Sequence, residues 1–350
     1  MVEEQVANTS TIIEGFFLQT VDDLIFDVKG ITHPKDKKIA YVRYVPIKGG
    51  TRSRGSSQTK YKKIYDLEKR YKFIKNNYPH YLFNDPKGRG LLQVVPHHLL
   101  KTIFDPRIKL VRIREKQSPE RLEKLVIEFV DNLLALSDVS SRALGISGSI
   151  LVDLPRKGSD IDLVVYGRDN GQKLYQAMPR VFGSSNAIHR YSREELKELW
   201  KNRGQEHQIS FSEFFQLEKD KRLQGKIKGT EFYIRLVLLP EEYYEPYEKT
   251  VIESLGEIEL EGTVEKNGTQ IFTPCIYHLT GVTVLSKEEK KLDILPSRIF
   301  SVRGRYCELA HKGDRVRVRG KLEQIRNDRE KYFQVVLGIR DNDFFKRKRK

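Results

Sequence analysis

The stretch GSILVDLPRKGSDIDLVVYG, Gly148–Gly167, carries residue types whose spacing suits the handling of phosphate groups. Asp160 and Asp162 stand two residues apart at the head of an apolar run, so in a strand their side chains would project from one face. Two adjacent carboxylates repel each other unless a cation lies between them, and Mg²⁺ or Mn²⁺ takes such oxygens together with phosphate oxygens. A glycine lets the backbone approach a triphosphate closely, and a serine hydroxyl can bind a phosphate oxygen. We therefore predict Gly148, Ser149 and Ser159 as nucleotide-binding residues, and Asp160 and Asp162 as catalytic metal ligands.

Elements on both sides of this stretch are needed to position the carboxylates. A helix is predicted to begin at Ser118 and to carry one apolar face from Leu122 to Leu134. A second helix is predicted at GQKLYQAMPRVF, residues 171–182, and Thr230–Pro240, TEFYIRLVLLP, is predicted to be a buried strand. The order helix, strand, turn, strand, helix and later strand predicts a small α/β or α+β core.

The segment from Leu144 to Tyr166, with the pair GS followed by SDIDLVV, resembles the DNA polymerase β superfamily of nucleotidyltransferases. The chain also resembles archaeal nucleotidyltransferase-like proteins of this length that have no assigned substrate. The resemblance implies that Gly148 and Ser149 hold the triphosphate and that Asp160 and Asp162 bind the metal ions. It further implies a third carboxylate on a later neighbouring strand.

The third carboxylate is where the sequence departs from this family. The strand within Thr230–Pro240 places Arg235 at the expected position, and Tyr233 and Val237 on the same face cannot replace an acid. An arginine beside two aspartates would compete with the metals. Three explanations stay open: a single-metal enzyme, a nucleotide-binding relic, or a ligand supplied from elsewhere, such as Glu213.

A basic segment near the N-terminus predicts a polyanionic partner. Val28–Lys75 holds 15 Lys or Arg and 3 Asp or Glu, interleaved with aromatic residues. Its Gly/Ser-rich loop can follow a phosphate backbone while nearby rings stack on bases. The predicted nucleic-acid contacts in this segment are Lys48, Arg52, Arg54, Lys60, Lys62 and Lys63.

The last hundred residues predict a small all-β domain. Strand alternation surrounds an Asn-Gly turn at 267–268, and GDRVRVRGKLE resembles a strand of an OB-fold. Arg315, Arg317 and Arg319 would present one basic side to nucleic acid, or serve as a polar face of a domain that only packs. The basic tail from residue 344 is expected to be disordered.

Composition sets the wider limits. The chain has 350 residues and a formal net charge of +16, which suggests several domains and a nucleic acid as the first candidate partner. The two cysteines form no CxxC motif, which fits a reducing cytoplasm, and no signal peptide or apolar span of 18 residues is present. The 32% share of charged residues and the two methionines favour a thermophile.

We therefore expect an α+β multidomain protein with a nucleotidyltransferase-like α/β core, a basic N-terminal region and a C-terminal OB-like β-barrel. The expected regions are 1–116 (basic α+β), 117–250 (nucleotidyltransferase-like), 251–343 (barrel) and 344–350 (basic tail).

The leading hypothesis is transfer of a nucleoside monophosphate from an NTP to structured RNA, with Mg²⁺ on Asp160 and Asp162. The alternative is a non-catalytic RNA- or ribosome-binding factor that reuses the fold. A third hypothesis is nucleotidylylation of a protein or small molecule. The sequence leaves open the base, the acceptor, the fold of residues 1–116 and the oligomeric state.

Overall fold

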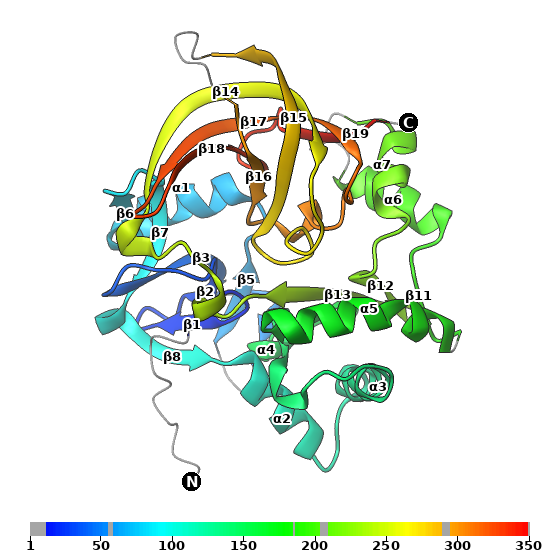
Figure 1. Ribbon diagram of the computed structural model, residues 1–350. Coiled ribbons are helices and arrows are strands. Elements are labelled where there is room, and N and C mark those ends of the chain that lie inside the picture. Colours follow the sequence, from blue (N-terminus) through cyan, green and yellow to red (C-terminus); the bar gives the residue numbers. More distant parts are fainter. Residues whose placement is uncertain (1–11, 55–58, 185, 204–208, 289–294, 349–350) are drawn as a thin grey trace. The chain divides into compact units, whose positions relative to one another are not determined.

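The chain folds as a mixed α+β protein with three sheets, which confirms the coarse fold class (Figure 1). The computed structural model describes residues 12–54, 59–184, 186–203, 209–288 and 295–348. Two compact units are present: Met1–Val181 with Ile227–Glu248, and Phe182–Lys226 with Lys249–Lys350. The basic N-terminal region and most of the predicted catalytic core thus belong to one unit.

The first unit opens with a large sheet, which gives a fold to the region that the sequence left open. Its strands are β1 (Phe17–Thr20), β2 (Ile25–Val28), β3 (Lys37–Pro46), β4 (Arg52–Ser53), β5 (Lys60–Lys63), β6 (Leu82–Asp85), β7 (Gly90–Pro96) and β8 (Leu100–Phe104). The order is β4-β5-β3-β2-β1-β8, and β7 pairs with both β3 and β6. The helices of this part are α1 (Leu67–Asn77) and α2 (Pro106–Glu115), with short 3₁₀ turns η2 (Pro79–Tyr81) and η3 (His97–Leu99).

The predicted core follows in the same unit. Its elements are α3 (Arg121–Leu136), η4 (Ser141–Ala143), β9 (Leu144–Ile146), α4 (Gly148–Leu151), β10 (Ile161–Tyr166), α5 (Arg168–Ser184), β13 (Thr230–Val237), η6 (Pro240–Glu242) and η7 (Tyr247–Lys249). Strand β10 lies between β9, which is antiparallel to it, and β13, which is parallel to it. The buried strand predicted within Thr230–Pro240 is therefore confirmed.

The helix whose N-cap was predicted at Ser118 begins two residues later. Glu120 is the N-cap of α3, and its backbone N–H donates to the Glu123 carboxylate at 2.7 Å in a capping box. This reciprocal cap satisfies the free backbone donors of the first turn, so the helix begins at Arg121. The apolar face is confirmed, because Val126, Phe129 and its neighbours are buried.

The second unit is built around a curved six-stranded sheet that forms a half-barrel. Its strands are β14 (Val251–Val264), β15 (Cys275–Lys287), β16 (Arg298–Ser301), β17 (Arg315–Arg326), β18 (Lys331–Val336) and β19 (Phe344–Arg347); η8 (Gly304–Tyr306) follows β16. The order is β14-β15-β16-β18-β17-β19, and β17 also pairs with β14. The remaining elements are α6 (Arg193–Arg203), α7 (Phe211–Glu218) and the strands β11 (Ile188–His189) and β12 (Gln224–Ile227).

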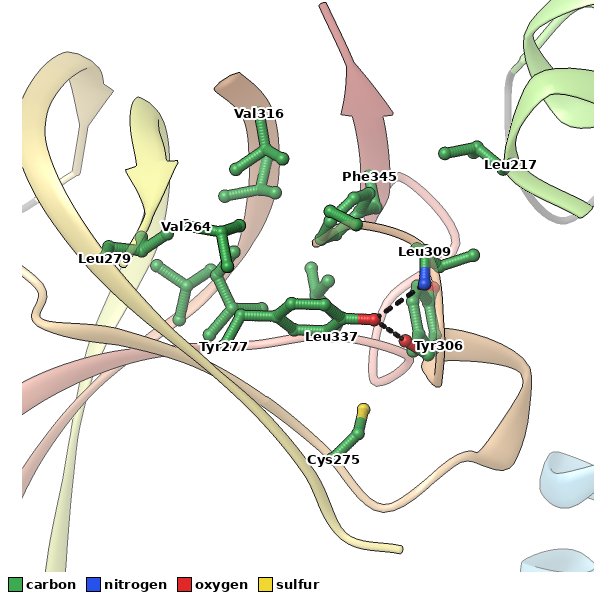
Figure 2. Packing of buried hydrophobic residues seen from close by; sticks show 14 of the residues in the cluster. Leu217, Val264, Cys275, Tyr277, Leu279, Tyr306, Leu309, Val316, Leu337 and Phe345 are labelled. Atoms are coloured by element: carbon green, nitrogen blue, oxygen red, sulfur yellow. Dashed lines mark hydrogen bonds between the residues drawn. The ribbon is translucent and has the colours of Figure 1, made fainter. Parts of the chain in front are cut away.

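The interior of the second unit is apolar and centres on a buried tyrosine (Figure 2). The Tyr277 hydroxyl donates to the Tyr306 carbonyl and accepts from the Leu309 backbone N–H at 2.9 Å. A buried phenol needs such partners, so the ring can fill the core without an unpaired polar atom.

The tail from residue 344 was predicted to be disordered, and this was wrong for the residues described. Phe344–Arg347 form β19, which pairs antiparallel with β17, and Phe344 and Phe345 are buried. Phe344 and Phe345 anchor a segment whose local charge alone suggested a free end. Residues 349–350 lie outside the described part. Within the described ranges, we find no helix that combines the length and the apolar character needed to cross a membrane.

Candidate active site

The two halves of the predicted motif meet at the contact between Gly148 and Asp162. The Ser147 backbone N–H donates to the Asp162 carbonyl at 2.8 Å, which brings the start of α4 against β10. Gly148 has φ +64°, and a Cβ built there would lie 2.0 Å from Asp162 Oδ2. A side chain at residue 148 would therefore displace the carboxylate, so glycine is required for both its conformation and its small size.

The electrostatic surroundings of Asp162 penalise its negative charge. Burial raises the pKa of Asp162 to about 6, and the Asp160 carboxylate acts in the same direction. Arg235, Lys63 and Arg43 oppose this increase without cancelling it. Asp160 itself is exposed, just before the first residue of β10. Two carboxylates are thus close enough to repel each other, which is the arrangement a bound cation would relieve.

The two predicted serines differ in their availability. Ser149 is 3% exposed, and its Oγ has no hydrogen-bond partner within the described part of the chain. A buried hydroxyl without a partner is costly, so this atom is a candidate phosphate contact. Ser159 accepts a hydrogen bond from the Arg156 backbone N–H at 2.9 Å and thereby shapes its own loop.

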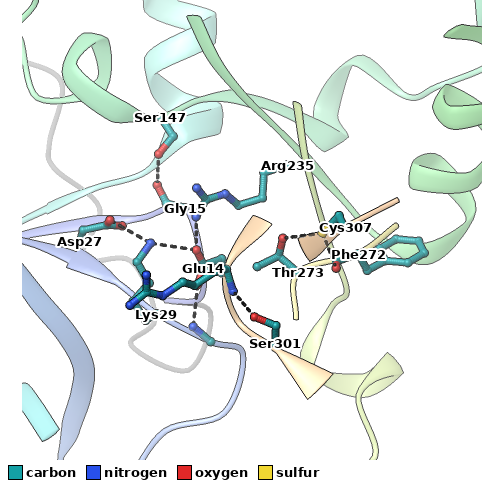
Figure 3. Close-up of polar contacts among 12 residues, drawn as sticks. Glu14, Gly15, Asp27, Lys29, Ser147, Arg235, Phe272, Thr273, Ser301 and Cys307 are labelled. Carbon is teal, nitrogen blue, oxygen red and sulfur yellow. Dashed lines mark hydrogen bonds and ion pairs between the residues drawn. The ribbon is translucent and has the colours of Figure 1, made fainter. Parts of the chain in front are cut away.

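The strand register decides which residue of β13 lies next to Asp162. Asp162 pairs directly with Tyr233 in the parallel ladder, and Arg235 stands opposite Val164, two residues further along the same face. Figure 3 shows that the Arg235 guanidinium forms its ion pair with Glu14. Arg235 is thus held by a partner from the N-terminal segment.

Glu14 is the centre of a buried charge network that no local sequence pattern indicates. It is 0% exposed, and it accepts from Lys29 Nζ at 3.1 Å and from the Gly30 backbone N–H at 2.7 Å. Lys29 also pairs with Asp27 at 2.8 Å (Figure 3). Glu14 precedes β1 in a segment without a recognisable motif, and only the tertiary fold brings it to Arg235.

Asp160 and Asp162 are the candidate metal ligands of this site. Among the described residues, no group of three or more His, Cys, Asp or Glu side chains is placed to hold a metal ion. Glu213, the alternative third ligand, instead caps its own helix α7 and pairs with Lys346 at 2.9 Å. Mg²⁺ is commonly held by one or two carboxylates plus substrate phosphates, so the residues present fit one such ion.

Two of the predicted nucleic-acid residues, Lys63 and Arg52, are partly or fully buried instead of lying on an open face. Asp160 and Asp162 act electrostatically on the ammonium of Lys63, and burial lowers the pKa of Lys63 to about 8. Arg52 is 5% exposed and donates to the Leu154 carbonyl in the loop between α4 and β10. Arg43, which was not singled out from the sequence, contributes to the same field.

The other predicted nucleic-acid residues of the first unit have different surroundings. Lys48, Lys60 and Lys62 are exposed. Arg54 is partly buried, donates to Gln19 Oε1 at 2.9 Å, and lies 4.8 Å from the Phe104 ring centroid. Part of the Gly/Ser-rich loop, residues 55–58, lies outside the described residues.

The arginine row of β17 is already paired with acids. Arg317 and Arg319 both contact Glu259, and the Arg319 Nε donates at 2.9 Å. Arg315 pairs with Glu261 at 3.2 Å. The row is therefore largely neutralised by the neighbouring strand β14, and an alternating basic pattern alone did not reveal those partners.

The comparisons with known proteins identify a full-length relative. The chain is 28% identical over 348 residues to the uncharacterized protein MJ1086 of Methanocaldococcus jannaschii. The alignment covers 95% of this chain and 98% of that protein, so the similarity extends over both units. No family model and no solved structure matches the chain.

Proposed function

We propose that this protein transfers a nucleoside monophosphate from an NTP to RNA at a site formed by Gly148, Ser149, Asp160 and Asp162. The observation that carries the proposal is the contact in which Gly148 lies against the Asp162 carboxylate with no room for a Cβ. It joins a phosphate-binding turn to a pair of carboxylates, as the resemblance to polymerase β-type nucleotidyltransferases leads us to expect. The core with β9, β10 and β13 supplies the scaffold.

Each residue of the proposed site has a separate role in the reaction. The backbone at Gly148 and the unpartnered Ser149 hydroxyl would hold phosphate oxygens, and Asp160 and Asp162 would hold one Mg²⁺ or Mn²⁺. The metal, when bound, neutralises charge on the triphosphate. The acceptor hydroxyl oxygen then bonds to the α-phosphorus, pyrophosphate leaves, and the hydroxyl proton is released.

RNA is the proposed acceptor because the chain carries a large positive excess. The formal net charge is +16, and Lys48, Lys60 and Lys62 are exposed beside the Gly/Ser-rich loop. Such cations give salt-sensitive, sequence-independent affinity for a phosphate backbone. The two buried free cysteines fit a reducing cytoplasm, where we place the protein.

We also propose that the half-barrel of the second unit is an OB-like domain. Its pairings run β14-β15-β16-β18-β17 and return to β14, with β16 and β18 parallel. A five-stranded, partly open barrel of this kind is a common support for oligonucleotides. Because the β17 arginines are paired with acids, we place RNA on other parts of this unit.

The alternative is a non-catalytic RNA- or ribosome-binding factor, and a specific observation favours it. Arg235, paired with Glu14, occupies the strand that carries the third carboxylate in the resembling enzymes. A site with two carboxylates can bind Mg²⁺ and a nucleotide without transferring it.

The deciding experiment is label transfer with purified protein, each α-labelled NTP in turn, Mg²⁺ or Mn²⁺, and total RNA from the source cells. The control variant is Asp160→Asn/Asp162→Asn. Label on a discrete RNA that disappears in the control supports the transferase. Label on protein supports nucleotidylylation of a protein instead. No label, together with RNA binding that survives in the control variant, supports the binding factor.

The RNA surface is tested separately by the salt dependence of binding. We expect Lys60→Gln/Lys62→Gln to reduce the slope of log affinity against log salt by about 1–2, since each phosphate contact contributes about one. The variant Arg315→Gln/Arg317→Gln/Arg319→Gln should leave the slope nearly unchanged, because those guanidinium groups are already paired. The reverse result would move the RNA surface to β17.

A further inference from the structure

Strand β5 places a partly buried lysine on one side and exposed lysines on the other. Tyr61 is 2% exposed and Lys63 shares its side of the strand, while Lys60 and Lys62 are exposed on the other side. Lys63 pairs in register with Tyr44 of β3. Its Nζ lies 5.0 Å from the Tyr65 ring centroid and 5.8 Å from that of Tyr44. The Lys63 ammonium is therefore held in place between two rings instead of extending into water.

Arg43 is turned toward the same place by an irregularity in the sheet. The β2–β3 ladder pairs Ile25 with Tyr44 and Phe26 with Val42, so Arg43 is left out of the pairing. Such a bulge redirects a side chain. The Arg43 guanidinium lies 5.4 Å from the Tyr65 ring centroid, next to Lys63.

The loop that leads to the carboxylates is attached to this sheet. Tyr44 and Tyr61 share an apolar cluster with Leu151 and Leu154, which lie in and just after α4. Arg52 adds a hydrogen bond to the Leu154 carbonyl from β4. This packing ties the sheet that carries Lys63 and Arg43 to the segment that leads to the carboxylates, and Arg52 acts as a positioning residue.

The two groups of charge lie close enough to influence each other. Lys63 and Arg43 both act electrostatically on Asp162, and Arg43 and Arg52 also act on Lys63. Lys63 and Arg43 thus lie near the carboxylate pair, and Arg52 lies near Lys63. A surplus of positive charge around a carboxylate pair, partly enclosed, suits a multiply charged anion that also brings a metal ion.

We propose that Lys63 and Arg43 bind the polyphosphate of the nucleoside triphosphate, so that the N-terminal sheet completes the nucleotide site instead of contacting RNA there. This inference rests on the nucleotide site proposed above. It assigns the inward side of β5 to the triphosphate and leaves the outward lysines for nucleic acid.

The test compares Lys63→Met with Lys62→Met, two changes of the same chemistry on opposite sides of one strand. Binding of ATP, GTP, CTP and UTP with Mg²⁺, and of the matching monophosphates, is measured by calorimetry, and thermal melting verifies that each variant is folded. We expect Lys63→Met to weaken triphosphate binding about 10–100-fold, the loss of one charge-assisted contact, and to change monophosphate binding much less. Lys62→Met should bind all ligands like the wild type, and Lys63→Arg should retain most of the affinity.

Three outcomes would overturn the inference, and they differ in what they mean for the proposed function. If the wild type binds triphosphates and Lys63→Met binds them equally well, the cluster does not hold the polyphosphate, although the proposed function survives. If Lys63→Met weakens monophosphates and triphosphates alike, the residue is only structural, and the inference is again overturned. If the wild type binds no nucleotide, the proposed function and this inference fail together.

Discussion

Replacing Asp162 with asparagine should make the protein more stable while it removes one of the two proposed metal ligands. The change keeps the shape of the side chain but removes a negative charge that the fold penalises. Burial raises the pKa of Asp162 from 3.8 to about 6, with Asp160 adding to the increase. At about 1.4 kcal/mol per pKa unit, the ionised carboxylate costs the folded state about 3 kcal/mol at most. Because the side chain is partly exposed, we expect a gain of about 1–3 kcal/mol in the free energy of unfolding.

The sign of the pH dependence follows from the raised pKa. Between pH 4 and pH 6 the folded wild type holds a proton on Asp162 that the unfolded chain has lost, so wild-type stability falls as pH rises through this window. The advantage of Asp162→Asn should therefore be complete above pH 6 and absent below pH 4. For a unit of this size the gain corresponds to about 2–4 °C in Tm per kcal/mol.

The assay is thermal and urea unfolding of both proteins at pH 4 and pH 7.5, with and without millimolar Mg²⁺. We expect Asp162→Asn to melt higher at pH 7.5, to match the wild type at pH 4, and to lose any stabilisation by Mg²⁺. A variant that melts lower at pH 7.5, or a difference that does not change with pH, would refute the argument that repulsion and burial destabilise this carboxylate.

Two further changes test the contacts around it. Gly148→Ala and the control Gly158→Ala both place alanine at positive φ, which should cost each about 1 kcal/mol in urea unfolding, and Gly148→Ala should cost more because its Cβ also meets the Asp162 side chain. Only Gly148→Ala should also weaken Mg²⁺–NTP binding, by more than about 10-fold. The reason is that its Cβ would meet Asp162, whereas a Cβ at Gly158 meets nothing within 4 Å. Equal binding by both variants would count against the site. Arg235→Gln should lower the free energy of unfolding by about 3 kcal/mol because it leaves Glu14 buried with fewer cations, and the double variant Glu14→Gln/Arg235→Gln should recover much of that loss. An Arg235→Gln variant with an unchanged free energy of unfolding would show that the ion pair does not support the fold.

Local patterns predicted several elements because their causes are local. The apolar period of α3, the strand within Thr230–Pro240 and the alternation in the last hundred residues each follow from side chains a few positions apart. The predicted start of α3 and the predicted disorder of the tail from residue 344 were wrong, because other contacts decided the structure of these segments. Glu123 completed a cap at Glu120, and Phe345 anchored a segment that looked like a free tail.

Residues close to one another in sequence set the local chemistry of the site: a glycine and a serine beside a turn, and two carboxylates at the head of a buried strand. The tertiary structure decided what surrounds them. Strand pairing over some seventy residues placed Tyr233 opposite Asp162, and the N-terminal segment supplied Glu14 to Arg235. It also brought Lys63 to the carboxylates and paired the β17 arginines with acids. The physical reason is that charge partners and strand register depend on packing between distant segments, which no local period encodes.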